Sequence, residues 1–127
     1  MPGSLGLTGS LVCAMPCRDL DSAIDWYTST LGFSLLFRAD EMGWCELTTP
    51  VADVNLGLSQ VESPDVTGGA TLTFGVNNIA AARAALEAKG VRFDGDTMTI
   101  PGMVSLATFF DPDGNKLMLF QNLSGQR

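Results

Sequence analysis

The stretch FFDPDGNKLML at residues 109–119 combines a tight polar turn with the start of an apolar strand. Asp-Pro-Asp-Gly reverses the chain, because Gly114 can adopt the positive φ that such a turn needs. A calcium-binding loop is excluded, since its sixth position is Lys116 where glycine is needed and its twelfth is Asn122 where glutamate is needed. The stretch therefore predicts a turn that leads into a buried strand.

One order of strand-like and helix-like segments occurs twice along the chain, with an offset of 59 residues that superposes Leu20 on Ile79 and Trp44 on Met103. Each copy begins with a strand and continues with a helix that Asp19 or Asn78 can cap. Three more strand-like segments follow each helix. The predicted helices are residues 20–31 and 78–89, and the predicted strands are 11–17, 33–38, 44–49, 54–60, 71–76, 91–93, 104–109 and 117–120.

Two βαβββ modules in tandem explain this repeat, so the predicted fold class is α+β. Each helix covers one face of its sheet, and pairing the other two faces gives a barrel-like cup. The predicted organisation is a loose N-terminal segment at 1–9, a first module at 10–61, a linker at 62–68, a second module at 69–122 and a tail at 123–127.

Composition narrows the possible functions. The net charge is −7 and the basic residues are scattered, so nucleic-acid binding is not expected. No apolar run reaches the length of a membrane span. Three cysteines without an export signal fit a reducing cytoplasm. The sequence contains no histidine, which excludes Ser-His-Asp and Cys-His catalysis and all His-ligated metal sites.

Two motifs carry a resemblance to a known family. RDLDSAIDWYTSTLGF at residues 18–33 and the stretch at 109–119 resemble the vicinal oxygen chelate superfamily over residues 11–121. That superfamily includes glyoxalase I, extradiol dioxygenases, fosfomycin-resistance enzymes and bleomycin-resistance proteins. The resemblance implies tandem βαβββ modules and a homodimer.

The resemblance also implies where a metal would bind. Family enzymes place His, Gln or Glu on four strands, and the matching positions here are Val12, Gly57, Thr71 and Met118. None of these side chains is a suitable ligand for a hard or borderline divalent ion, and a lone thioether suits only soft copper. No metal cofactor is therefore expected, which disfavours the metal-dependent activities of the family.

Side chains that alternate with the predicted core residues line the cup. They are mostly apolar with a few hydroxyl groups, which is typical of a small-molecule pocket. The alternative is that these side chains fill the cup and leave no room for a ligand. The candidate ligand-binding residues are Val12, Trp44, Glu46, Thr71, Thr73, Met103, Ser105, Met118 and Phe120.

Glu46 is the most informative candidate, because a carboxylate in the middle of a strand needs a partner or a function. It can anchor a cationic or hydroxylated ligand, act as a general base, or be a solvated group paired with Arg38. Cys13 and Cys45 are expected to be small core residues.

Two classes of function remain open. One is a metal-independent protein that binds, and thereby sequesters, a drug-like or aromatic metabolite, with Trp44 suited to a cationic planar ligand. The other is a metal-free lyase or isomerase in which Glu46 is the acid or base. A glyoxalase-like or dioxygenase-like enzyme remains only if the chain holds an unrecognised metal site, so the sequence does not decide whether the protein is an enzyme.

Overall fold

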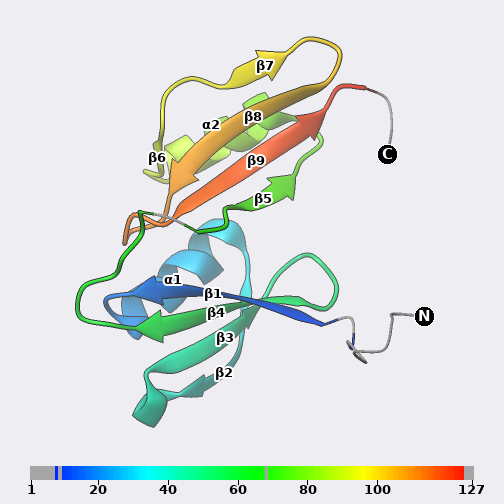
Figure 1. Cartoon of the computed structure of the whole chain (residues 1–127). Coiled ribbons are helices and arrows are strands. Elements are labelled where there is room, and N and C mark those ends of the chain that lie inside the picture. Colours follow the sequence, from blue (N-terminus) through cyan, green and yellow to red (C-terminus); the bar gives the residue numbers. More distant parts are fainter. Residues whose placement is uncertain (1–7, 9, 68, 125–127) are drawn as a thin grey trace. The chain divides into compact units, whose positions relative to one another are not determined.

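The computed structural model describes residues 8, 10–67 and 69–124, and most of the N-terminal segment expected at 1–9 lies outside them. The chain divides into two compact units, Met1–Pro64 (unit 1) and Asp65–Arg127 (unit 2). Each unit consists of one long helix and one sheet, which confirms the predicted α+β class (Figure 1). Among the residues described, neither helix is long and apolar enough to span a bilayer.

Unit 1 has the predicted βαβββ order, with one added 3-10 turn. Its sheet order is β1-β4-β3-β2, and only the β1–β4 pair is parallel. A bulge interrupts the edge strand β2 between Leu35 and Phe37. The elements are β1 (Leu11–Cys17), α1 (Leu20–Leu31), β2 (Ser34–Ala39), η1 (Asp40–Met42), β3 (Trp44–Thr48) and β4 (Val54–Gln60).

Unit 2 repeats this topology with one difference. Its sheet order is β5-β9-β8-β6, and a further short strand, β7, also pairs with β8. Because β6 and β7 both lie along β8, they share the edge position that β2 holds alone in unit 1. The elements are β5 (Leu72–Gly75), α2 (Ile79–Ala88), β6 (Arg92–Phe93), β7 (Met98–Ile100), β8 (Val104–Phe110) and β9 (Lys116–Asn122).

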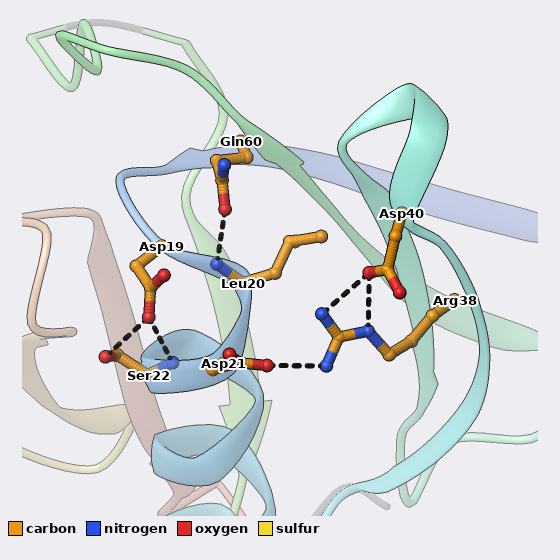
Figure 2. Close-up of polar contacts among 7 residues, drawn as sticks. All are labelled: Asp19, Leu20, Asp21, Ser22, Arg38, Asp40 and Gln60. Atoms are coloured by element: carbon orange, nitrogen blue, oxygen red, sulfur yellow. Dashed lines mark hydrogen bonds and ion pairs between the residues drawn. The ribbon is translucent and has the colours of Figure 1, made fainter.

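The helix N-termini explain why both helices begin where they do. The Asp19 carboxylate accepts the backbone N–H of Ser22 at 2.9 Å, and the Gln60 side chain accepts the N–H of Leu20 at 2.8 Å (Figure 2). These two acceptors satisfy donors that have no partner within the helix. The backbone bond from Ser22, and then its hydroxyl, hold the pKa of Asp19 below its usual value.

Unit 2 uses the same pair of acceptors. The Asn78 side chain accepts the N–H of Ala81 at 3.0 Å, and the Gln121 side chain accepts the N–H of Ile79 at 2.8 Å. In each unit, therefore, the last strand supplies a glutamine that holds the first turn of the helix against the sheet.

An ion-pair cluster joins β2 to its neighbours in unit 1. The guanidinium of Arg38 lies 2.7 Å from both the Asp21 carboxylate of α1 and the Asp40 carboxylate of η1 (Figure 2). Hydrogen bonds to Asp21 and Asp40 raise the pKa of Arg38. The cluster thus fixes the direction of the Arg38 side chain and engages its charge.

The core of each unit lies between its helix and the facing side of its sheet. In unit 1 the side chains of Tyr27, Cys45, Leu47, Leu56 and Leu58 are fully buried. Unit 2 buries Ile79, Leu86, Ala107, Phe109, Leu117 and Leu119. The predicted alternation is confirmed, because Cys45 and Leu47 are buried while Trp44, Glu46 and Thr48 between and beside them are half-buried.

The turn at 111–115 is built around one buried carboxylate. Asp111 accepts the N–H groups of Asp113 at 2.9 Å and Asn115 at 2.8 Å, and also the Asn115 side-chain amide at 2.8 Å. Gly114 has a φ of 93°, as the sequence predicts for this turn. The polar groups of this stretch thus satisfy one another, and the turn delivers β9 to the centre of its sheet.

Candidate functional site

The sheet face of unit 1 that points away from α1, the distal face, combines an aromatic ring, a carboxylate and an amide. The strand register places Glu46 opposite Gly57 and Thr48 opposite Asn55. On the opposite edge of β4 runs its parallel neighbour β1, whose Val12 is the register partner of Asn55. The residues that define the distal face are Val12, Trp44, Glu46, Thr48, Asn55 and Gly57.

Trp44 lies directly over Gly57. A Cβ atom added to Gly57 would meet the Trp44 ring carbons Cη2 at 2.2 Å and Cζ2 at 2.5 Å, distances that real contacts do not reach. Glycine is therefore required for the indole to lie this close to the strand backbone. Gly75 plays the same part in unit 2, where its Cβ would lie 2.9 Å from Cζ of Phe120.

Glu46 has little compensation for its charge. The carboxylate is half-buried, and Asn55 Nδ2 donates to Oε1 across a long 3.5 Å. Pairing with Arg38, one of the interpretations of the sequence, is wrong, because the guanidinium is held by Asp21 and Asp40. Among the described residues no cation forms an ion pair with Glu46. A half-buried carboxylate of this kind favours a cationic or hydroxylated ligand.

A cavity of about 410 Å³ adjoins the distal face. It is lined by Val12, Thr48 and Asn55 of that face, and by Leu36 at the bulge of β2. Asp53 closes one side with a positive φ of 62°, a conformation that aspartate tolerates better than most residues. Apolar walls with hydroxyl, amide and carboxylate groups suit a small organic molecule.

The family metal positions do not form a ligand set. In unit 1, Val12 and Gly57 offer no donor atom, although the strand register puts the Glu46 carboxylate opposite Gly57. In unit 2, Thr71 precedes β5, and Met118 lies between Thr73 and Thr108. No group of three His, Cys, Asp or Glu side chains suited to a metal occurs among the residues described. The residues present therefore do not fit a divalent metal ion.

The candidate residues of unit 2 are only partly brought together. Thr73 and Met118 are register partners, and Phe120 lies on Gly75 in the next register pair on the same face. Two placements are wrong. Met103 lies in the turn before β8 and is 61% exposed, and Ser105 lies on the face towards α2, where its hydroxyl bonds that of Thr99 at 2.9 Å.

Both errors have the same cause. Trp44 pairs with the residue before Gln60, and Leu106 pairs with the residue before Gln121. Leu106, and not Met103, is therefore the counterpart of Trp44. The single offset of 59 residues fails beyond the helices because the loop between β6 and β7 adds length to unit 2.

Cys45 does not contribute a nucleophile to this site. Cys45 is fully buried on the side of β3 that faces α1, and burial raises the pKa of its thiol. A buried thiol with a raised pKa holds little of the reactive thiolate. This agrees with the expectation that Cys45 is a core residue.

Comparison with known proteins identifies the family. Residues 10–119 match the model of the Glyoxalase/Bleomycin resistance protein/Dioxygenase superfamily. No curated protein matches the sequence significantly. Among solved structures, the chain is similar to TnmS3, an antibiotic binding protein from Streptomyces sp. CB03234, with 28% identity, 93% of this chain and 98% of that chain covered, and a TM-score of 0.76.

Two further structures support the same fold. A glyoxalase/bleomycin resistance protein from Streptomyces sp. CB03234 is 29% identical, with 87% and 97% of the two chains covered and a TM-score of 0.68. A superfamily member from Sphaerobacter thermophilus DSM 20745 is 24% identical, with 91% and 98% covered and a TM-score of 0.78. The chain belongs to the glyoxalase/bleomycin resistance protein/dioxygenase superfamily and has its α+β fold.

Proposed function

We propose that the protein binds a small planar, cationic organic molecule without a metal ion, on the distal face of unit 1. The observation that carries this proposal is the presence, on one sheet face, of the Trp44 ring against Gly57 and the weakly compensated carboxylate of Glu46. An indole face attracts both aromatic rings and cations, and a half-buried carboxylate selects for positive charge. The similarity to TnmS3, an antibiotic binding protein, supports a drug-like ligand.

The test compares proflavine, a planar aromatic cation, with acridone, a neutral molecule of similar shape. Calorimetric titration is expected to show binding of proflavine and much weaker binding of acridone. Trp44→Ala and Glu46→Gln are each expected to weaken proflavine binding about tenfold, the equivalent of about 1.4 kcal/mol. Glu41→Gln, a charge change on the exposed turn η1 of the same unit, is the matched control. Equal affinity for both compounds, or equal loss in all three variants, contradicts the proposal.

A second function, metal-free acid–base catalysis by Glu46, is favoured by the same carboxylate, since among the described residues only a long hydrogen bond from Asn55 compensates its charge. Mass spectrometry of ligand recovered after long incubation separates the two functions. Sequestration predicts unchanged ligand. Catalysis predicts a new product that Glu46→Gln abolishes while binding persists.

We also propose a homodimer in a reducing cytoplasm. The edge strand β2 exposes three consecutive apolar side chains, Leu35, Leu36 and Phe37, at 43%, 53% and 44%. Exposed apolar residues at a sheet edge are typical of an interaction surface. All three cysteines are free, which fits the reducing compartment. Light scattering that gives the monomer mass at micromolar concentration contradicts the dimer.

A further inference from the structure

The sheet of unit 2 carries two positively charged side chains in one row across its strands, opposite in charge to Glu46. Arg92 of β6 pairs with Phe110 of β8, which pairs in turn with Lys116 of β9. Register partners in antiparallel strands project to the same side of a sheet. Phe109 and Leu117, the neighbours of Phe110 and Lys116, are fully buried on the other side. The three side chains of this cationic row therefore lie together on the face away from α2.

Arg92 is positioned by its aromatic neighbour. Its guanidinium carbon lies 4.2 Å from the centroid of the Phe110 ring, so the side chain leans over β8 towards the strand of Lys116. Stacking on a ring uses the flat face of the guanidinium and leaves its N–H edge available for an oxyanion. Among the described residues neither Arg92 nor Lys116 forms an ion pair.

Two such cations in one row are unusual for this chain, which has 7 Lys and Arg against 14 Asp and Glu. The acidic residue Asp94 lies beside the row, because its N–H bonds the Thr108 carbonyl at 2.8 Å and so continues the pairing of β6 with β8. Asp94 forms no ion pair with Arg92 within the described residues. The turn that joins Phe110 to Lys116 adds Asp113 and also Asp111, whose buried carboxylate accepts hydrogen bonds from within the turn.

The adjacent rows on the same face supply an apolar surface. Thr108 pairs with Met118, and Leu106 pairs with Phe120. A molecule held by its anionic end at Arg92 and Lys116 can thus lay an apolar body across Met118 and Phe120. We propose that the cationic row and these neighbours form a second binding site, on unit 2, for a small aromatic carboxylate.

The test uses naphthoate, its neutral analogue naphthamide, and inorganic phosphate, each titrated against the isotope-labelled protein by NMR. Naphthoate is expected to shift the Arg92 Nε–Hε signal and the Phe110 ring signals, with naphthamide at least threefold weaker. Phosphate, which lacks the apolar body, is expected to bind more weakly than naphthoate. About tenfold more salt is expected to weaken naphthoate binding but not naphthamide binding.

Substitutions of the charged residues are expected to change the naphthoate affinity in opposite directions. Arg92→Gln and Lys116→Gln are each expected to weaken naphthoate binding about three- to fivefold, as for exposed ion pairs. Asp94→Asn is expected to tighten it, because a nearby negative charge is removed. Lys89→Gln, at the end of α2, is the matched control and should change nothing.

The proposal fails if naphthoate causes no shift at millimolar concentration, or if naphthamide binds equally well. It also fails if Asp94→Asn and Arg92→Gln change the affinity in the same direction. Trp44→Ala distinguishes the two sites, because it is expected to weaken proflavine binding about tenfold and leave naphthoate binding unchanged. A similar weakening of both ligands in Trp44→Ala shows a single site and refutes the second one.

Discussion

Gly57→Ala tests whether the close approach of Trp44 to the sheet organises the distal face. The added Cβ atom would lie 2.2 Å from Cη2 of Trp44, and ordinary contact begins at 3.4 Å, so the ring must retreat by about 1.2 Å. Because the colliding atoms are the far end of a side chain, the indole tilts and the strand stays in place. The distal face then loses the close contact of its aromatic ring with the strand while the fold persists.

The expected change in stability is small because two effects oppose each other. A side chain forced away from its rotamer costs about 0.5–1.5 kcal/mol. Replacing glycine within a strand returns about 0.5–1 kcal/mol. The free energy of unfolding should therefore change by less than about 1 kcal/mol. In a Trp44→Ala background the collision is absent, and Gly57→Ala should stabilise the protein by about 0.5–1 kcal/mol.

The assay combines urea denaturation of the four proteins in this double-mutant cycle with fluorescence. Trp26→Phe leaves Trp44 as the sole tryptophan, since the chain has two. Gly57→Ala should shift the Trp44 emission to longer wavelength and weaken proflavine binding. Gly75→Ala, which displaces Phe120 in unit 2, is the matched control and should leave the Trp44 emission unchanged. Unchanged emission in Gly57→Ala, together with zero coupling in the cycle, refutes this role of Gly57.

The helix N-termini and the metal positions support three further predictions. Gln60→Ala should lower the free energy of unfolding by about 0.5–1.5 kcal/mol through loss of the bond from Leu20, and Gln60→Glu should retain it; equal loss in both variants contradicts the bond. The pKa of Asp19 is lower in the folded chain than its unfolded value of 3.8. Its contribution to the free energy of unfolding is therefore fully present above pH 3.8 and is lost as pH falls through the folded pKa. Between neutral pH and pH below about 4, urea denaturation should therefore show a smaller loss of stability for Asp19→Asn than for the native chain. Identical pH profiles of the two proteins would refute this. Addition of a chelator should leave the melting temperature unchanged. If elemental analysis instead finds one metal ion per chain, and chelation removes it and lowers stability, a metal-dependent function becomes the better explanation.

The sequence predicts the regular elements well wherever strong local signals bound them. The bounds of β1, α1 and β4 match their predicted ranges, and those of α1 do so because Asp19 caps the helix and Gly32 ends it with a positive φ of 77°. The strand β7 was not predicted. It has three residues, all exposed, so it shows neither burial alternation nor length, and only its pairing with β8 makes it a strand.

The candidate sites could be predicted only in part, because side chains meet across strands in ways that the sequence does not state. Alternation along β3 identifies Trp44 and Glu46, but nothing in Leu-Gly-Leu shows that Gly57 lies beneath the indole. The pairing of Arg92 with Phe110 depends on the register of β6 with β8. The sequence does not show this register, because a long connection that includes β7 separates the two strands.

The glutamine bonds make Leu20 and Ile79 natural reporters for amide hydrogen exchange. Each amide belongs to the first turn of a helix, where exchange is normally fast, yet each is bonded to a strand that lies 40 or 42 residues further along the chain. Slow exchange at such a position requires that the helix and the last strand of the unit stay docked together. Comparing the opening free energies at these two amides therefore shows whether the two halves of the chain unfold as one cooperative unit or independently.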